Sequence, residues 1–300
     1  MITTMARGLD AVRARAGDLL FARVAGPEGP RNRERIHTTP GPRWFAPDSP
    51  VRRVHGDSSM FIGGLSALLL QSLHPQAMAA VAAHSGFRGD PWGRLQRTST
   101  FLATTTYGTA RSAQAACDRV NAVHARISGR TSRGVPYRAS DPHLVQWVHV
   151  AEVDSFLRAH QQFGAHPLTR DECDTYIAET ARIARALEVP DPPESVRALA
   201  DCMAGYRGEL RGTPEALETT RYLLFRPPVP LPALPFYAAL ASNAVALLPH
   251  WAATELGLTR FDPAERWLVR PVGRAATGLI RWAMGQTRPA GGPAEAPSAD

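Results

Sequence analysis

One short stretch of the chain carries two arginines and a threonine at helical spacing. Arg94 precedes Arg97 by three residues and Thr98 by four, which places all three on one face of a helix. Two cations and a hydroxyl are unusual for a plain core on a face that also carries Phe101, so the group is a candidate for function. Two simpler interpretations stay open: Arg97 can be solvated, and the Thr98 hydroxyl can bond to its own helix.

A single histidine offers a second candidate for chemistry. His124 lies on or beside an apolar helical stripe that includes Val120, Val123 and Ile127. A histidine in such a place is more often a hydrogen-bonded core residue. Haem proteins nevertheless use this arrangement, because one neutral imidazole that projects from an apolar wall can hold the iron. The pattern therefore makes His124 a candidate iron ligand and leaves the core interpretation open.

Other histidines lack the spacing of familiar metal sites. Those considered are His74, His84, His143 and His149. No pair of them has the four-residue step of a His-Glu-x-x-His zinc site. Glu152, Glu172 and Glu179 do not form the paired Glu-x-x-His motifs of di-iron bundles. The spacing therefore argues against a non-haem metal enzyme of either class.

The basic residues are all arginine, because the 300-residue sequence contains no lysine. A lysine Schiff base and a phosphate-loop lysine are therefore excluded. The net charge of +7 comes from scattered arginines without a clustered patch, so we expect no nucleic-acid partner. A hydrophobic share of 44% and a charged share of 20% are ordinary for a globular protein with a large core.

Cysteine usage and the apolar stretches predict a cytoplasmic protein with no stable membrane span. The three cysteines, Cys117, Cys173 and Cys202, are sparse and far apart, which is typical of a reducing compartment. Residues 1–24 contain no continuous apolar run, so we expect no signal peptide. The longest apolar stretches, 60–70 and 234–248, are short for a membrane span and favour buried helices.

Helix signals recur along the chain and strand signals are almost absent, so we expect an all-α fold in a single multi-helix domain. The predicted helices cover residues 6–24, 59–73, 75–83, 91–107, 110–128, 142–163, 170–187, 192–206, a short stretch from 214, 236–256 and 263–283. Asp90 and Asp141 are predicted N-caps, and Thr169 with Glu172 forms a predicted capping box. Residues 25–56 are expected to form an extended arm, and residues 286–300 a disordered tail.

Four groups of residues, taken together and in order, resemble one known protein family. They are Leu68-Leu69-Leu70-Gln71 with His74-Pro75; His84-Ser85-Gly86-Phe87 with Asp90-Pro91-Trp92-Gly93-Arg94-Leu95-Gln96-Arg97-Thr98; Tyr107-Gly108-Thr109 with Val123-His124 and Gly129; and Tyr137-Arg138-Ala139-Ser140-Asp141-Pro142 with Trp147-Val148-His149. This set is similar to the family of MpaB oxygenases and rubber-cleaving latex-clearing proteins. The resemblance covers about residues 58–255, and each motif alone is weak.

The resemblance implies a globin-reminiscent helical bundle around a non-covalent haem b. His124 falls on the family's proximal iron ligand, and Arg94 and Thr98 fall on its distal pair. Arg97 replaces a lysine of the rubber-cleaving branch, which can occupy the sixth iron site. Arginine stays charged and cannot do so, although it can pair with a haem propionate or an acid. This departure, with the missing export signal, argues against polyisoprene as the substrate.

The resemblance also implies the domain organisation and the function. Residues 1–57 would form an N-terminal helix and arm, residues 58–285 the catalytic haem-binding domain, and residues 286–300 the tail. The expected activity is that of a haem-dependent oxygenase acting with dioxygen on a small apolar or aromatic molecule, by oxidative C=C cleavage or hydroxylation. A peroxide-driven reaction would need the same parts. Two alternatives are a non-catalytic haem protein for gas sensing or haem handling, and a helical scaffold whose polar residues are structural.

Overall fold

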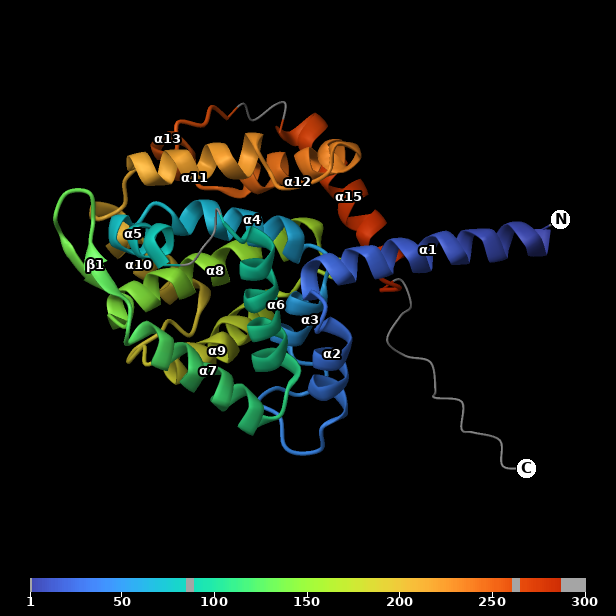
Figure 1. Cartoon of the computed structure of the whole chain (residues 1–300), viewed down its shortest axis with the longest axis horizontal. Coiled ribbons are helices and arrows are strands. Elements are labelled where there is room, and N and C mark those ends of the chain that lie inside the picture. The colour runs from blue at the N-terminus through green and yellow to red at the C-terminus, as the bar shows by residue number, and fades with distance from the viewer. Residues whose placement is uncertain (1, 85–88, 261–264, 287–300) are drawn as a thin grey trace.

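The computed structural model describes residues 2–84, 89–260 and 265–286, and within them the predicted all-α fold is confirmed (Figure 1). The described chain contains one small sheet, the antiparallel hairpin of β1 (Ser128–Arg130) and β2 (Pro136–Arg138). None of the described helices is long and apolar enough to cross a membrane. Of the predicted disordered tail, only Gln286 falls within the described residues.

Two helices form the centre of the molecule. α4 (Met60–Gln71) packs along α8 (Pro142–Phe163), as expected for apolar runs that must be buried. The close approach depends on Gly63, because a Cβ there would lie 3.1 Å from Ala159 Cβ and from Phe156 Cδ1. Glycine lets the two helices come together at this point, so α4 and α8 act as one unit.

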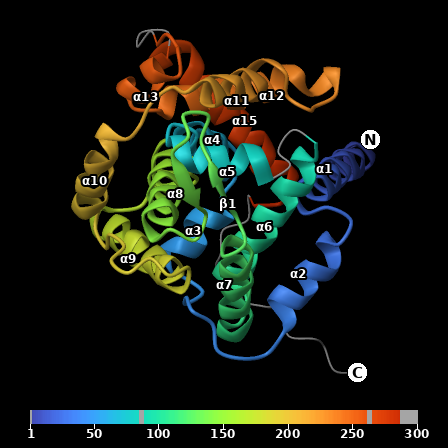
Figure 2. The same cartoon turned by 60° about the vertical axis from the view of Figure 1, so that its left-hand side comes forward.

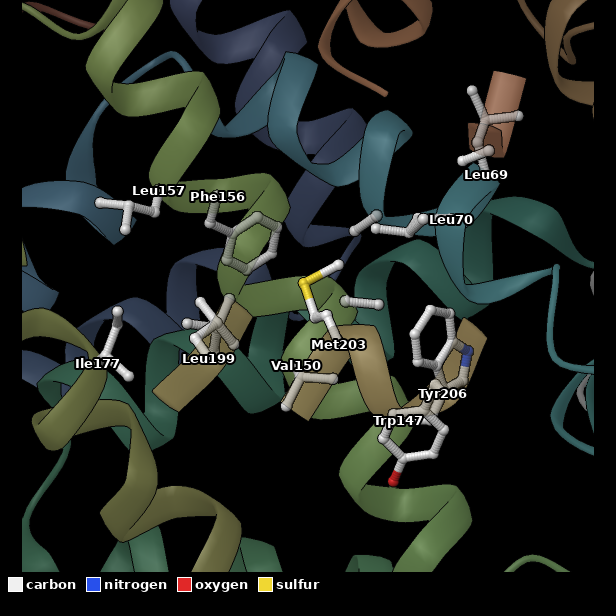
Figure 3. Close-up of a cluster of buried hydrophobic side chains, with 14 of the residues drawn as sticks. Leu69, Leu70, Trp147, Val150, Phe156, Leu157, Ile177, Leu199, Met203 and Tyr206 are labelled. Atoms are coloured by element: carbon white, nitrogen blue, oxygen red, sulfur yellow. The ribbon is translucent and has the colours of Figure 1, made fainter. Parts of the chain in front are cut away.

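The main core lies between α8 and the helices on its far side, α9 (Arg170–Ala186) and α10 (Val196–Gly205). Figure 3 shows side chains that α4, α8, α9, α10 and the residue after α10 contribute to this core. They include Leu70, Trp147, Val150, Phe156, Leu157, Ile177, Leu199, Met203 and Tyr206. Trp147 and Val150 are fully buried, which fixes the rotation of α8 about its axis.

A second, smaller core covers the opposite side of α4. α12 (Leu234–Leu247) and α15 (Arg270–Ala283) pack there, with Ile62, Leu240, Ala244 and Ile280 buried between them. α1 (Ile2–Ala25) contacts α6 (Pro91–Tyr107) and α15, and its N-terminal end projects away from the body (Figure 1). α5 (Pro75–His84), α11 (Pro214–Phe225) and α13 (His250–Glu255) complete the bundle (Figure 2).

The helices that carry Arg94 and His124 form a hairpin. α6 (Pro91–Tyr107) begins at the predicted cap, where Gly93 N donates to Asp90 Oδ1 at 2.8 Å. After Gly108 and the capping residue Thr109 the chain reverses into α7 (Ala110–His124). In Figure 1 the two helices meet at this junction and diverge away from it. Arg94 and His124 therefore lie near the two open ends of the hairpin.

The expectation of an extended arm over residues 25–56 was wrong. The segment contains α2 (Gly29–Thr38) and α3 (Pro50–Gly56), and it buries Ile36, Val51 and Val54. The error has a physical reason: Pro30 and Pro50 occupy first-turn positions, where proline starts a helix. The segment is therefore part of the packed body.

Two helix boundaries also differ from the prediction. The predicted helix 110–128 ends at His124, because the chain turns there into β1. The predicted helix 236–256 is divided into α12 and α13 at Pro249, whose ring lacks an N–H and disfavours a helical residue before it. The capping box of α9 is formed as predicted, with Thr169 and Glu172 bonding each other's backbone.

Candidate functional site

His124 ends α7 as a half-buried imidazole. Burial lowers the pKa of His124, so the ring is neutral at neutral pH and keeps a lone pair. No residue of the described ranges donates to or accepts from the ring nitrogens. A neutral imidazole without a hydrogen-bond partner is a suitable ligand for iron.

The arginines of α6 differ in exposure. Arg94 is half-buried, and burial together with the nearby charge of Arg97 lowers its pKa. Arg97 is exposed, with Nη1 3.4 Å from Asp90 Oδ2. Thr98 is exposed as well. The structure thus brings Arg94 and Arg97 together on the first turns of α6, while the roles assigned to them and to Thr98 stay predictions.

Two ionisable residues lie deep on α8, one helical turn apart. Burial lowers the pKa of His149 to about 4 and raises the pKa of Glu152 to about 7. Both side chains nevertheless keep partial exposure, while His149 Nε2 is enclosed and has no hydrogen-bond partner in the described chain. Burial therefore disfavours the charged form of both side chains in this part of α8.

Gln71, the last residue of α4, holds this part of α8 in place. Its side-chain Nε2 donates to Val148 O at 3.1 Å, and its backbone carbonyl accepts from Trp147 Nε1 at 3.2 Å. Its side chain also hydrogen-bonds Glu152. Gly64 lies two turns earlier on the same face of α4, and a Cβ there would meet nothing within 4 Å. The face of α4 that reaches Glu152 is therefore bordered by open space.

Buried polar side chains continue from Glu152 towards α3. His55 Nδ1 is 2.8 Å from Thr106 Oγ1, and His55 Nε2 is 3.4 Å from the Tyr176 hydroxyl. Burial lowers the pKa of His55 to about 3. Burial, followed by the charges of Glu152 and Asp154, raises the pKa of Tyr176. The side chains of His55, Thr106 and Tyr176 are neutral at neutral pH, and they are hydrogen-bonded to one another inside an apolar core.

Sequence reasoning found only part of this polar interior. His149 was considered as a possible ligand, and Glu152 only as part of a di-iron motif that the sequence lacks. The signal that could have found the pair is their position on the most apolar stretch of α8, next to Trp147 and Val150. An ionisable residue on such a helix must border either a partner or a cavity.

The chain was compared with known proteins. Residues 52–282 match the family model described as "ER-bound oxygenase mpaB/B'/Rubber oxygenase, catalytic domain". No curated protein and no solved structure gave a match. The matched region begins inside α3 and ends in α15, so it contains both the α6–α7 hairpin and the polar interior of α8.

Proposed function

Since the chain belongs to the catalytic-domain family of the mpaB and rubber oxygenases, we propose that it is a haem b-dependent oxygenase acting on a small apolar or aromatic organic molecule. Oxygenase activity follows from the family. The haem, the substrate class and a cytoplasmic location are our proposals. The observation that carries the haem proposal is His124, a neutral imidazole without a hydrogen-bond partner among the described residues.

The residues present fit a haem group on two grounds. His124 offers a lone pair without first having to lose a proton or a hydrogen bond. The second ground is open space beside Gly64 on α4, together with the enclosed Nε2 of His149 on α8, which has no hydrogen-bond partner among the described residues. A largely apolar protein interior with a few unpartnered polar atoms is typical of a cofactor site.

Haem b held by His124 would supply the activation of dioxygen or of peroxide. The chain's own donors are Arg94 and Thr98, which share one face of α6. We assign them the role of stabilising negative charge that develops on the oxidant. Arg97 cannot act as an iron ligand because its guanidinium stays protonated, so its proposed partner is a haem propionate or Asp90.

Glu152 is the residue best suited to hold a proton in this interior. Its pKa of about 7 means that the carboxyl group can give or take a proton near neutral pH. The amide of Gln71 holds the carboxyl group in one orientation. Phe101 and Met60 are partly buried against the same core, and such side chains exclude water and favour an apolar substrate. The proposed reaction is oxidative cleavage of a C=C bond or hydroxylation.

The test is an absorption spectrum of the purified protein, followed by turnover. We expect a Soret band from one haem per chain, extractable into acidic organic solvent because the chain lacks a Cys-x-x-Cys-His attachment motif. Oxygen uptake on addition of an alkene or a phenol distinguishes an oxygenase from a haem protein that only binds gas. Absence of a Soret band after haem supplementation would reject the haem proposal.

A further inference from the structure

A second group of potential ligands, which does not include His124, lies where three distant parts of the chain meet. His74 lies between α4 and α5, His143 is the second residue of α8, and Glu209 follows the short helix η1 (Tyr206–Gly208). One ligand atom of each residue lies within 4.8 Å of those of the other two. His143 Nε2 is 2.9 Å from Glu209 Oε1, and His74 Nε2 is 3.3 Å from Glu209 Oε2.

These separations are those of a small metal site. Zinc binds imidazole nitrogen and carboxylate oxygen at about 2.0–2.2 Å, so neighbouring ligands of a tetrahedral ion lie roughly 3.3 Å apart. The two measured separations, 2.9 and 3.3 Å, are close to this value. Two histidines and one carboxylate are also a common ligand set for zinc and for iron outside haem.

The surroundings favour a cation. The carboxylates of Glu209 and Asp141 both act electrostatically on His74. Asp141 is held in place by its own N-cap bond, in which His143 N donates to Asp141 Oδ1 at 3.0 Å. Two carboxylates beside two imidazoles give the group a negative charge that a divalent ion would balance.

Packing already orients the two imidazoles. The ring of His143 lies 4.5 Å from that of Tyr206, whose hydroxyl donates to His143 O at 2.8 Å. His74 is 1% exposed and lies beside Trp147. Glu209 and His143 remain exposed on their outer side, which leaves room for water to complete the coordination. A site with three protein ligands and an open position has this form.

We propose that His74, His143 and Glu209 bind one divalent transition-metal ion of the zinc type, with water in the remaining position. The site shares no residue with the haem site proposed at His124, because it uses none of the residues of α6 or α7. Its ligands are up to 135 residues apart, so the ion ties the α4–α5 junction and the start of α8 to the segment after η1. Bound metal therefore stabilises the folded chain.

The test uses the full-length protein dialysed against Zn²⁺, followed by elemental analysis and thermal unfolding. We expect one zinc per chain and a rise of several degrees in Tm. Zinc is counted separately from haem iron, so the result does not depend on the haem proposal. X-ray absorption at the zinc edge should show two imidazole ligands.

The variants His143→Asn and Glu209→Gln each remove one exposed ligand, so neither should disturb the core. Each should weaken zinc binding by at least about 100-fold. Mutation of a residue that only hydrogen-bonds to a metal ligand already lowers metal affinity by about 10–100-fold, and here the ligand itself is removed. His166→Asn, which changes an exposed histidine outside the group, is the matched control and should bind like the wild type. No zinc in the wild type, or unchanged binding by His143→Asn, would overturn the proposal.

Discussion

The α6–α7 hairpin and the α4–α8 pair place polar groups in opposite ways. On the hairpin, His124 and Arg94 are half-buried and Thr98 is exposed, in helices that meet at one end and diverge. On the pair, His149 and Glu152 are strongly desolvated, and His149 Nε2 is enclosed without a hydrogen-bond partner in the described chain. Both regions hold a neutral histidine without a hydrogen-bond partner in the described chain, so neutrality alone does not identify an iron ligand. Both histidines are partly exposed, so the choice of His124 rests on the family resemblance.

The largest effect on haem binding is expected from replacing His124 and His149 with alanine, one at a time. His124→Ala should abolish stable haem binding and leave the far-ultraviolet circular dichroism of the fold largely unchanged, because the side chain is only half-buried. His149→Ala should keep the haem. Haem content after gel filtration measures both. If His124→Ala keeps wild-type haem content and spectrum, another histidine is the ligand, with His149 and His74 next in line.

The donors of the hairpin should affect turnover and not haem content. Arg94→Ala or Thr98→Ala should slow oxygen consumption by about 10²–10³, the usual loss for one preorganised donor. The Soret intensity per chain should stay the same. If Thr98→Ala consumes oxygen as fast as the wild type, the Thr98 hydroxyl has no part in the mechanism and only contacts solvent.

The enclosed pair makes a prediction about pH. Burial raises the pKa of Glu152 in the folded protein from 4.5 to about 7. The buried carboxyl group therefore does not lower the free energy of unfolding below pH 4.5, where it is protonated in both states, and lowers it most above pH 7, where it must ionise inside the protein. Glu152→Gln should therefore match the wild type in stability at pH 4 and exceed it by up to about 3 kcal/mol at pH 9. Denaturant unfolding at the two pH values measures the difference. An equal change at both would mean that ionisation of Glu152 is not its cause.

The smallest effect is expected at Arg97. Its exposed contact with Asp90 should contribute less than about 1 kcal/mol to folding, so Arg97→Ala should unfold nearly like the wild type.

The ferric protein should be five-coordinate or water-bound and should bind cyanide readily. Arg97→Lys should give a low-spin, six-coordinate form if the side chain reaches the metal. A low-spin electron paramagnetic resonance signal with two nitrogen ligands in the wild type contradicts the open site.

Local signals in the sequence predicted the helices well. Asp90 and the Thr169–Glu172 capping box mark helix starts in the structure as they do in the sequence. The same local rules misjudged residues 25–56, since proline density suggested an arm where Pro30 and Pro50 begin helices. The stability of α3 comes from burial of Val51 and Val54, which no local pattern reports.

The sites were harder to predict, because they depend on how distant segments meet. The hydrogen bond between Gln71 and Glu152 exists only because α4 packs on α8. The spacing of histidines along the chain could not bring His74 and His143 to Glu209, which is 135 residues from His74. The family resemblance identified His124, Arg94, Arg97 and Thr98, whose roles are still to be tested.

The neighbouring glycines Gly63 and Gly64 give this molecule an unequal tolerance to mutation. One extra methyl group at Gly63 would press on Ala159 and Phe156, while the same group at Gly64 would enter open space. A methyl group at Gly63 therefore requires Ala159 or Phe156 to move by a few tenths of an ångström, while a methyl group at Gly64 requires no neighbour to move. Two adjacent positions of one helix thus differ in the substitutions that they accept, and the difference comes from packing alone.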